Sequence, residues 1–101
     1  MKTGIELIAA ERQRQIEVEK WSVGHDDEHD EGQLARAAAC YALPDNIRQW
    51  KLSHYTSLVW NVWPFDAEWL KLTPNNRIKE LTKAGALIAA EIDRLQRRNL
   101  K

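Results

Sequence analysis

The chain has 101 residues, which is enough for one domain with a modest core. Its 15 basic and 15 acidic side chains leave no net formal charge. It therefore lacks the positive field that binds nucleic-acid phosphates nonspecifically. A single cysteine, Cys40, excludes an internal disulfide and predicts a buried thiol in a reducing compartment, so a cytoplasmic protein is expected. Its apolar runs are too short to cross a bilayer, and Lys2, Glu6 and Glu11 interrupt any signal peptide, so no membrane contact is expected.

Residues 3–20 are predicted to form the first helix, because apolar side chains recur on one side of it and acidic ones on the other. Thr3 and Glu6 have the spacing of a capping box. Arg12 lies within the apolar side, where an unpaired guanidinium would be very costly. Two interpretations of Arg12 therefore stay open: a structural buried ion pair, or contact with a ligand.

Residues 21–32 break the helical periodicity and carry two histidines and five carboxylates in a row. Oxygen ligands suit magnesium or manganese and imidazole suits zinc, so this run is a candidate metal site. The candidate ligands are His25, Asp26, His29 and Asp30. The competing interpretation is a solvated acidic loop that leads into a helix N-terminus.

Residues 31–43 are predicted to form a second helix, apolar on nearly every side after Arg36 and therefore central in the fold. Its alanines should allow a close crossing with small residues near Gly85. Tyr41 needs a partner for its hydroxyl group if it is buried, so it is either a core tyrosine or part of a pocket wall. Pro44 ends this helix.

Residues 47–60 fit a further short helix only loosely, and a cluster of aromatic side chains follows. Tryptophan is enriched both in hydrophobic lids and in binding surfaces, so the cluster is either a lid on a small core or a patch that binds a partner. The candidate partner-binding residues are Trp60, Trp63, Phe65 and Trp69.

The clearest helical pattern lies in residues 73–98, where Thr73 is expected to cap the start. Apolar or small residues recur at gaps of three and four, which places them on one face of a helix. We call this face the apolar stripe; it consists of Ile78, Leu81, Gly85, Ile88, Ile92 and Leu95. We expect the apolar stripe to pack inward, with Glu80, Ala84, Leu87 and Glu91 on a flank that could hold a metal or contact a second copy.

Several segments resemble small proteins of tailed bacteriophages and prophages. They are Glu11-Arg12-Gln13-Arg14-Gln15, His25-Asp26-Asp27, Gly32-Gln33-Leu34-Ala35, Trp63-Pro64-Phe65 and Leu81-Thr82-Lys83-Ala84-Gly85. The resemblance covers most of the chain except residues 45–60, which look like an insertion. It implies a phage or prophage protein in a bacterial host cell.

More remotely, the order of elements is similar to that of MazG-like all-α nucleoside triphosphate pyrophosphohydrolases, which use magnesium to release pyrophosphate. The resemblance implies Asp30 and Glu80 as candidate metal ligands; Glu91 is a candidate substitute ligand, and Arg12 or Lys83 would contact the phosphates. That chemistry requires two pairs of carboxylates, each pair one helical turn apart. The chain has Asp30-x-x-Gln33 and Glu80-x-x-Lys83, so two of the four carboxylates are absent.

The sequence therefore predicts one all-α domain over residues 1–101, a small helical bundle organised around its long C-terminal helix. The first functional hypothesis is a phage accessory protein that binds a host or defence component, or sequesters a nucleotide-like ligand, without turnover. Its candidate ligand-binding residues are Arg12, Tyr41 and Lys83. The alternative is a divergent pyrophosphohydrolase that would need Mg²⁺. A third hypothesis is purely structural oligomerisation as a two-fold dimer, and a homo-oligomer is expected.

Overall fold

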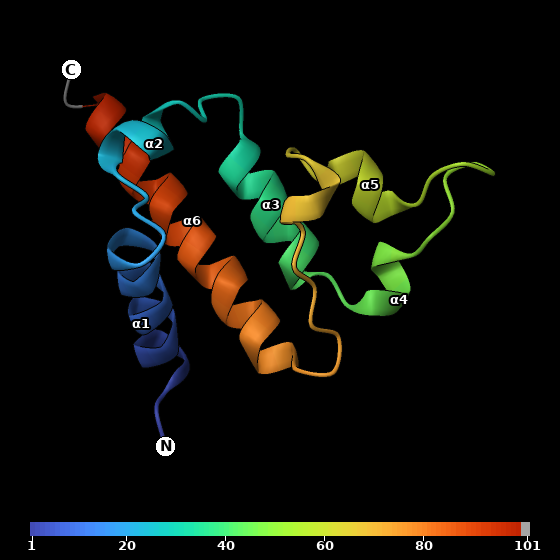
Figure 1. Ribbon diagram of the computed structural model, residues 1–101, viewed down its shortest axis with the longest axis horizontal. Helices are drawn as coiled ribbons and strands as arrows, with labels where there is room; N and C mark the ends of the chain where they lie inside the picture. The colour runs from blue at the N-terminus through green and yellow to red at the C-terminus, as the bar shows by residue number, and fades with distance from the viewer. Residues whose placement is uncertain (100–101) are drawn as a thin grey trace.

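The computed structural model describes residues 1–99 and confirms the all-α fold (Figure 1). The helices are α1 (Gly4–Glu17), α2 (Val23–Asp27), α3 (Gln33–Ala42), α4 (Asp45–Arg48), α5 (Leu58–Val62), the 3₁₀ helix η1 (Ala67–Trp69) and α6 (Arg77–Asn99). Within these residues the only extended pairing is an isolated bridge between Lys51 and Ser57. None of the described helices combines the length and the apolar character that crossing a bilayer requires.

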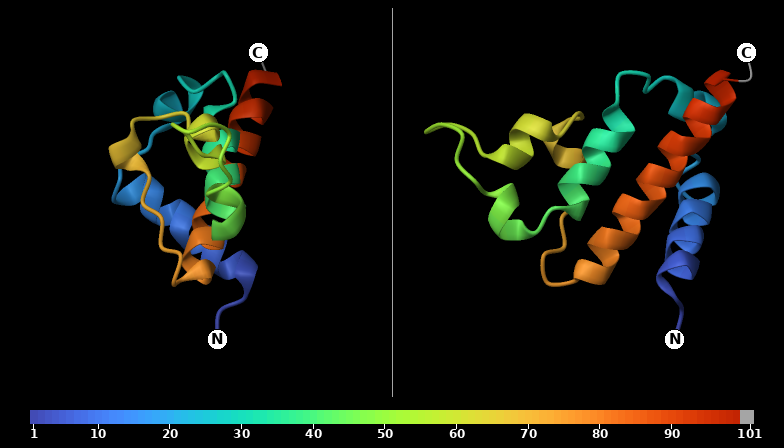
Figure 2. Two further views of the ribbon diagram at one scale, coloured as in Figure 1. Left: turned by 90° about the vertical axis from the view of Figure 1, so that its right-hand side faces the viewer. Right: turned by 180° about the vertical axis from the view of Figure 1, so that it is seen from behind.

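The long helix α6 lies in the middle of the fold, between α1 and α3 (Figure 1). It runs parallel to α1 and antiparallel to α3, and its most extensive contacts are with α3. The segment that joins α5 to α6 crosses one side of this three-helix layer, whereas the opposite side carries no other segment (Figure 2). The protein is therefore a helical layer that is covered on one side only.

Local capping signals fix where α1 and α6 begin. The Thr3–Glu6 capping box is confirmed, since Thr3 Oγ1 accepts from the Glu6 amide at 3.2 Å and Glu6 Oε1 accepts from the Thr3 amide at 2.9 Å. The expected start of the long helix at Thr73 is wrong, because α6 begins at Arg77. There the Asn76 side chain accepts from the Lys79 amide at 3.2 Å, as an N-cap does.

The helix expected over residues 47–60 is also wrong. The structure instead has the short helices α4 and α5, which are joined by a loop that contains the Lys51–Ser57 bridge. The loop places Trp50 and Tyr55 at the surface. The irregular spacing of apolar residues in this stretch is explained by this break, because no single helical face runs through it.

The core lies between α3 and α6. Its members include Leu34, Tyr41 and Leu87, together with Trp63 and Val59. Cys40 is a free thiol and fully buried, as expected. The prediction that α3 is the central helix is wrong, since three of its alanines face solvent: Ala35, Ala39 and Ala42. The central helix is α6.

The apolar stripe does not pack inward, which corrects the sequence-based expectation. Ile78 is 67% exposed and Ile92 is 51% exposed. The flank that was expected to be free forms the core instead, since Ala84 and Leu87 are 3% and 5% exposed. Periodicity shows that a helix has an apolar side, but small residues such as Ala84 decide where a neighbouring helix can approach closely.

Gly85 packs against a side chain of α1, whereas the sequence suggested a contact with α3. A Cβ atom at position 85 would lie 2.6 Å from Ile8 Cγ1. Isoleucine has one strongly preferred χ1 rotamer in a helix, so Ile8 does not move aside cheaply. The missing side chain at Gly85 is therefore what lets α1 lie against α6.

This contact predicts a change of sign in a double-mutant cycle. In the wild-type background, Gly85→Ala should lower stability by about 1 kcal/mol, because overpacking costs about 1–3 kcal/mol and alanine's helix propensity returns about 1 kcal/mol. In an Ile8→Ala background the clash is absent, and Gly85→Ala should raise stability by about 1 kcal/mol. Urea unfolding of the four proteins measures both effects; the same sign in both backgrounds would contradict this packing.

Candidate functional site

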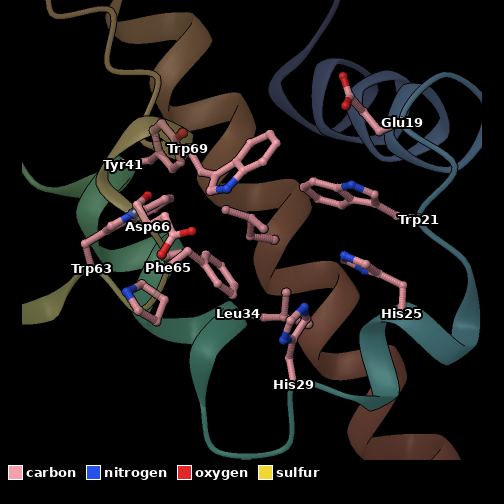
Figure 3. A pocket seen from close by; sticks show the side chains of 13 residues that line it. Glu19, Trp21, His25, His29, Leu34, Tyr41, Trp63, Phe65, Asp66 and Trp69 are labelled. Atoms are coloured by element: carbon pink, nitrogen blue, oxygen red, sulfur yellow. Dashed lines mark hydrogen bonds between the residues drawn. The ribbon is translucent and has the colours of Figure 1, made fainter.

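A cavity of about 550 Å³ lies between α6 and the segments that cover it (Figure 3). Five parts of the chain contribute to its wall: the α1–α2 linker, α2 with the turn after it, α3, α6, and residues 63–69. The lining residues are Glu19, Trp21, His25, His29, Leu34, Ala37, Tyr41, Trp63, Pro64, Phe65, Asp66, Trp69 and Leu87. A cavity of this size falls within the range of small-molecule sites.

Aromatic and imidazole side chains form a series of contacting rings along the cavity wall. We call them the aromatic row: Trp21, His25, His29, Phe65, Trp63 and Tyr41. The first pair is stacked at 5.2 Å between ring centroids, and the other four are edge-to-face pairs at 4.9 to 5.9 Å. Such spacings are favourable for aromatic pairs. The row joins segments that are up to 44 residues apart in sequence into one wall.

A buried ion pair positions the α2 side of the cavity. Arg12 Nη2 lies 2.7 Å from Asp26 Oδ2, and Asp26 is fully buried. The other carboxylate oxygen lies 3.1 Å from His25 Nδ1, and the Ser22 side chain accepts from the His25 amide at 3.1 Å. The carboxylate partner expected for Arg12 is therefore Asp26, and the pair orients the His25 ring beside Trp21.

Hydrogen bonds position the opposite side. Trp63 is 8% exposed, and its indole nitrogen donates to the Asp66 carbonyl oxygen at 2.9 Å. The Tyr41 hydroxyl accepts from the Lys71 amide at 3.0 Å. Burial raises the pKa of Tyr41, although that hydrogen bond opposes the shift. Tyr41 is thus both a satisfied core tyrosine and part of the cavity wall.

No lysine or arginine lines the cavity, whereas two carboxylates, Glu19 and Asp66, do. Burial lowers the pKa of His29, and the nearby His25 lowers it further, which favours the neutral imidazole. Lys83 lies outside the wall, with Nζ 5.3 Å from the centroid of the Tyr41 ring. The cavity is therefore aromatic and acidic, an environment that is unfavourable for phosphate groups.

Glu80 lies at a different place, at the N-terminal end of α6, and is fully buried. Its Oε2 lies 2.9 Å from Arg48 Nη2 and accepts from the Thr73 amide at 3.1 Å. Its Oε1 lies 2.8 Å from Arg77 Nη1. The same two arginines donate to the carbonyl oxygens that end α3, from Cys40 to Leu43. We call this group the Glu80 cluster: Glu80, Arg48, Arg77 and Thr73.

In the Glu80 cluster, both oxygens of the Glu80 carboxylate already have donors from the protein itself as partners. Burial by itself would raise the pKa of Glu80, but hydrogen bonds from Arg77 and Arg48 outweigh it, and the net pKa is lowered. Both carboxylate oxygens have cationic partners, so a magnesium ion would have to displace at least one guanidinium.

The other proposed metal ligands are dispersed. Glu91 lies 2.6 Å from Arg94 Nε. Asp30 lines a separate hollow together with Asp27 and three arginines, Arg94, Arg97 and Arg98. In residues 1–99, no three His, Cys, Asp or Glu side chains are grouped closely enough to hold a metal ion.

The proposed partner-binding aromatics divide into two kinds. Trp63, Phe65 and Trp69 line the cavity, while Trp60 lies outside it. Trp69 is 62% exposed and Trp60 is 49% exposed. Sequence reasoning did not identify Trp21 as a site residue, although an isolated tryptophan beside an acidic run was visible. It also missed Arg48, which lies in the stretch that the sequence assigned to a single helix.

This chain matches no family model, no curated protein and no solved structure. The site must therefore be interpreted from its own geometry.

The Glu80 cluster predicts a large stability effect. Glu80→Gln removes the charge that compensates two guanidinium groups, one of them fully buried, so it should destabilise the protein by about 3–5 kcal/mol. Glu68→Gln, a matched change at an exposed position, should change stability by less than about 0.5 kcal/mol. Urea unfolding followed by circular dichroism measures both; equal effects would show that the cluster does not carry this energy.

Proposed function

We propose that this protein is a binding protein that sequesters a small, flat aromatic ligand of the nucleobase or nucleoside class in the cavity, without turnover. The observation that carries this proposal is that two indole rings from distant segments, Trp21 and Trp69, both line the cavity (Figure 3). A flat ring bound in the cavity can stack on an exposed indole face, and each stacked base contributes about 1–3 kcal/mol.

The charged side chains that line the cavity indicate which class of ligand it would bind. The Glu19 and Asp66 carboxylates can accept hydrogen bonds from amino groups at a ring edge, as adenine or guanine carries. No cationic side chain among the lining residues would compensate a triphosphate. An uncharged base or nucleoside therefore fits this wall better than a nucleotide does.

The alternative is the magnesium-dependent pyrophosphohydrolase, and the geometry favours it less. That reaction needs several carboxylates around one ion. Of the three candidates, Glu80 and Glu91 are paired with arginines, and Asp30 lies in the hollow formed with Arg94, Arg97 and Arg98. A binding protein requires none of these groups to change partners.

The resemblance to tailed-phage proteins extends the proposal. In that setting the ligand would be a nucleobase- or nucleoside-like signal of the bacterial host or of its defence, withdrawn from use in the host cytoplasm. A host or phage protein that inserts an aromatic side chain is the corresponding protein partner. This extension depends on the resemblance alone.

The test is ligand binding by matched tryptophan variants. Isothermal titration with adenosine, guanosine and their free bases should detect binding by the wild type. Trp69→Ala should weaken it about 5- to 100-fold, because one stacking surface is lost. Trp50→Ala is the control, since Trp50 is also 62% exposed but lies outside the cavity, and it should bind as the wild type does.

Three results would contradict the proposal. One is the absence of binding by every base and nucleoside tested. Another is an equal loss in both tryptophan variants. The third is preference for a nucleoside triphosphate with release of pyrophosphate when magnesium is added, which would establish the alternative.

A further inference from the structure

No segment of the described chain crosses the side of the helical layer opposite the cavity (Figure 2, right), and we assign an apolar face to this side. The exposed members of the apolar stripe belong to it: Ile78, Leu81, Ile88, Ile92 and Leu95, which are 41–67% exposed. They follow a heptad spacing along almost the whole of α6, the pattern of a helix that pairs with another helix. An isolated exposed leucine needs no explanation, but a continuous stripe does.

Helix α1 enlarges this face. Ile8 points at Gly85, and α1 runs parallel to α6. At 100° per residue, Ile5 and Ile16 then lie 60–80° around α1 from the Ile8 side chain. This direction places them on the same side of the α1–α6 pair as the apolar stripe. Ile5 is 82% exposed and Ile16 is 44% exposed.

We infer that this face is the interface of a homodimer, with the apolar stripe of α6 and Ile5 and Ile16 of α1 packed against the same residues of a second copy. The inference does not depend on the proposed ligand.

The apolar area of this face is close to the area that a dimer interface requires. At about 120 Å² for a fully exposed leucine or isoleucine side chain, the exposed fractions of the seven residues correspond to roughly 450 Å² of apolar surface per chain. A standard interface buries about 800 Å² per partner, and in homodimers about 65% of it, roughly 520 Å², is apolar. The face therefore supplies most of the apolar area of one stable interface.

The heptad pattern also favours a second copy over an unrelated partner. A two-fold interface brings one surface patch against itself, so the patch must be self-complementary. The stripe is uncharged, and Ile78 and Ile92 lie seven residues before and seven residues after Gly85. Two antiparallel stripes can therefore meet with isoleucine opposite isoleucine. The arrangement closes a helical bundle and leaves both cavities on the outer sides.

Light scattering after gel filtration tests the inference. The wild type should have twice the 11.8 kDa mass of one chain. Ile88→Asp and Ile92→Asp each place a charge at the interface and should shift the protein to the monomer or weaken the dimer at least tenfold. Leu52→Asp is the matched control, since Leu52 is 50% exposed against 48% for Ile88 but lies in the α4–α5 loop, and it should remain dimeric.

Crosslinking keeps the test decisive if a charged variant fails to fold. In a Cys40→Ala background, Ile88→Cys should form an intermolecular disulfide under mild oxidation, whereas Leu52→Cys should not. A wild-type mass of one chain at every concentration would overturn the inference. So would a dimer that both aspartate variants leave intact while Leu52→Cys crosslinks. Nucleoside binding measured on the same samples reports separately on the proposed function.

Discussion

The buried ion pairs of Glu80 are the interaction on which the rest of the structure depends. Glu80 lies on the first turn of α6, Arg48 on α4 and Arg77 beside it on α6, and the two arginines also donate to the carbonyl groups that end α3. A helix C-terminus leaves carbonyl groups without partners, and here guanidinium groups satisfy them. One carboxylate therefore holds α3, α4 and the start of α6 together, and the Thr73 amide adds the segment that precedes α6.

The cavity follows from this arrangement. Once α3 is fixed against α6, Tyr41 and Leu34 form its floor, and the segment between α5 and α6 has to return across them. That segment carries Trp63, Phe65 and Trp69, while the Arg12–Asp26 pair holds α2 and its histidines on the other side. The Glu80 cluster and the Arg12–Asp26 pair thus both position the aromatic wall of the cavity. The wall itself contains no lysine or arginine side chain. This separation is the reason that we propose binding of an uncharged ring and not hydrolysis of a triphosphate.

The sequence predicted those features that depend on neighbouring residues. The Thr3–Glu6 capping box, the end of α3 before Pro44 and the burial of Cys40 are local or compositional, and all are present. Periodicity also located the apolar stripe, but its direction was predicted wrongly, because a pattern does not tell whether its partner lies in the same chain. The cavity combines five segments, so no local signal describes it. Glu80 had a visible one-turn neighbour in Arg77, whereas Arg48 is 32 residues away and could not be paired with it by spacing.

The central claim is that Glu80 is a structural counter-ion and not a metal ligand. The most direct measurement is an NMR pH titration of the Glu80 side-chain carboxyl carbon, with and without magnesium. Because Arg48 and Arg77 outweigh the effect of burial, the account predicts a pKa below the ordinary glutamate value of 4.5 and no change in the signal at neutral pH when magnesium is added. A carboxyl signal that shifts with magnesium at neutral pH would contradict it.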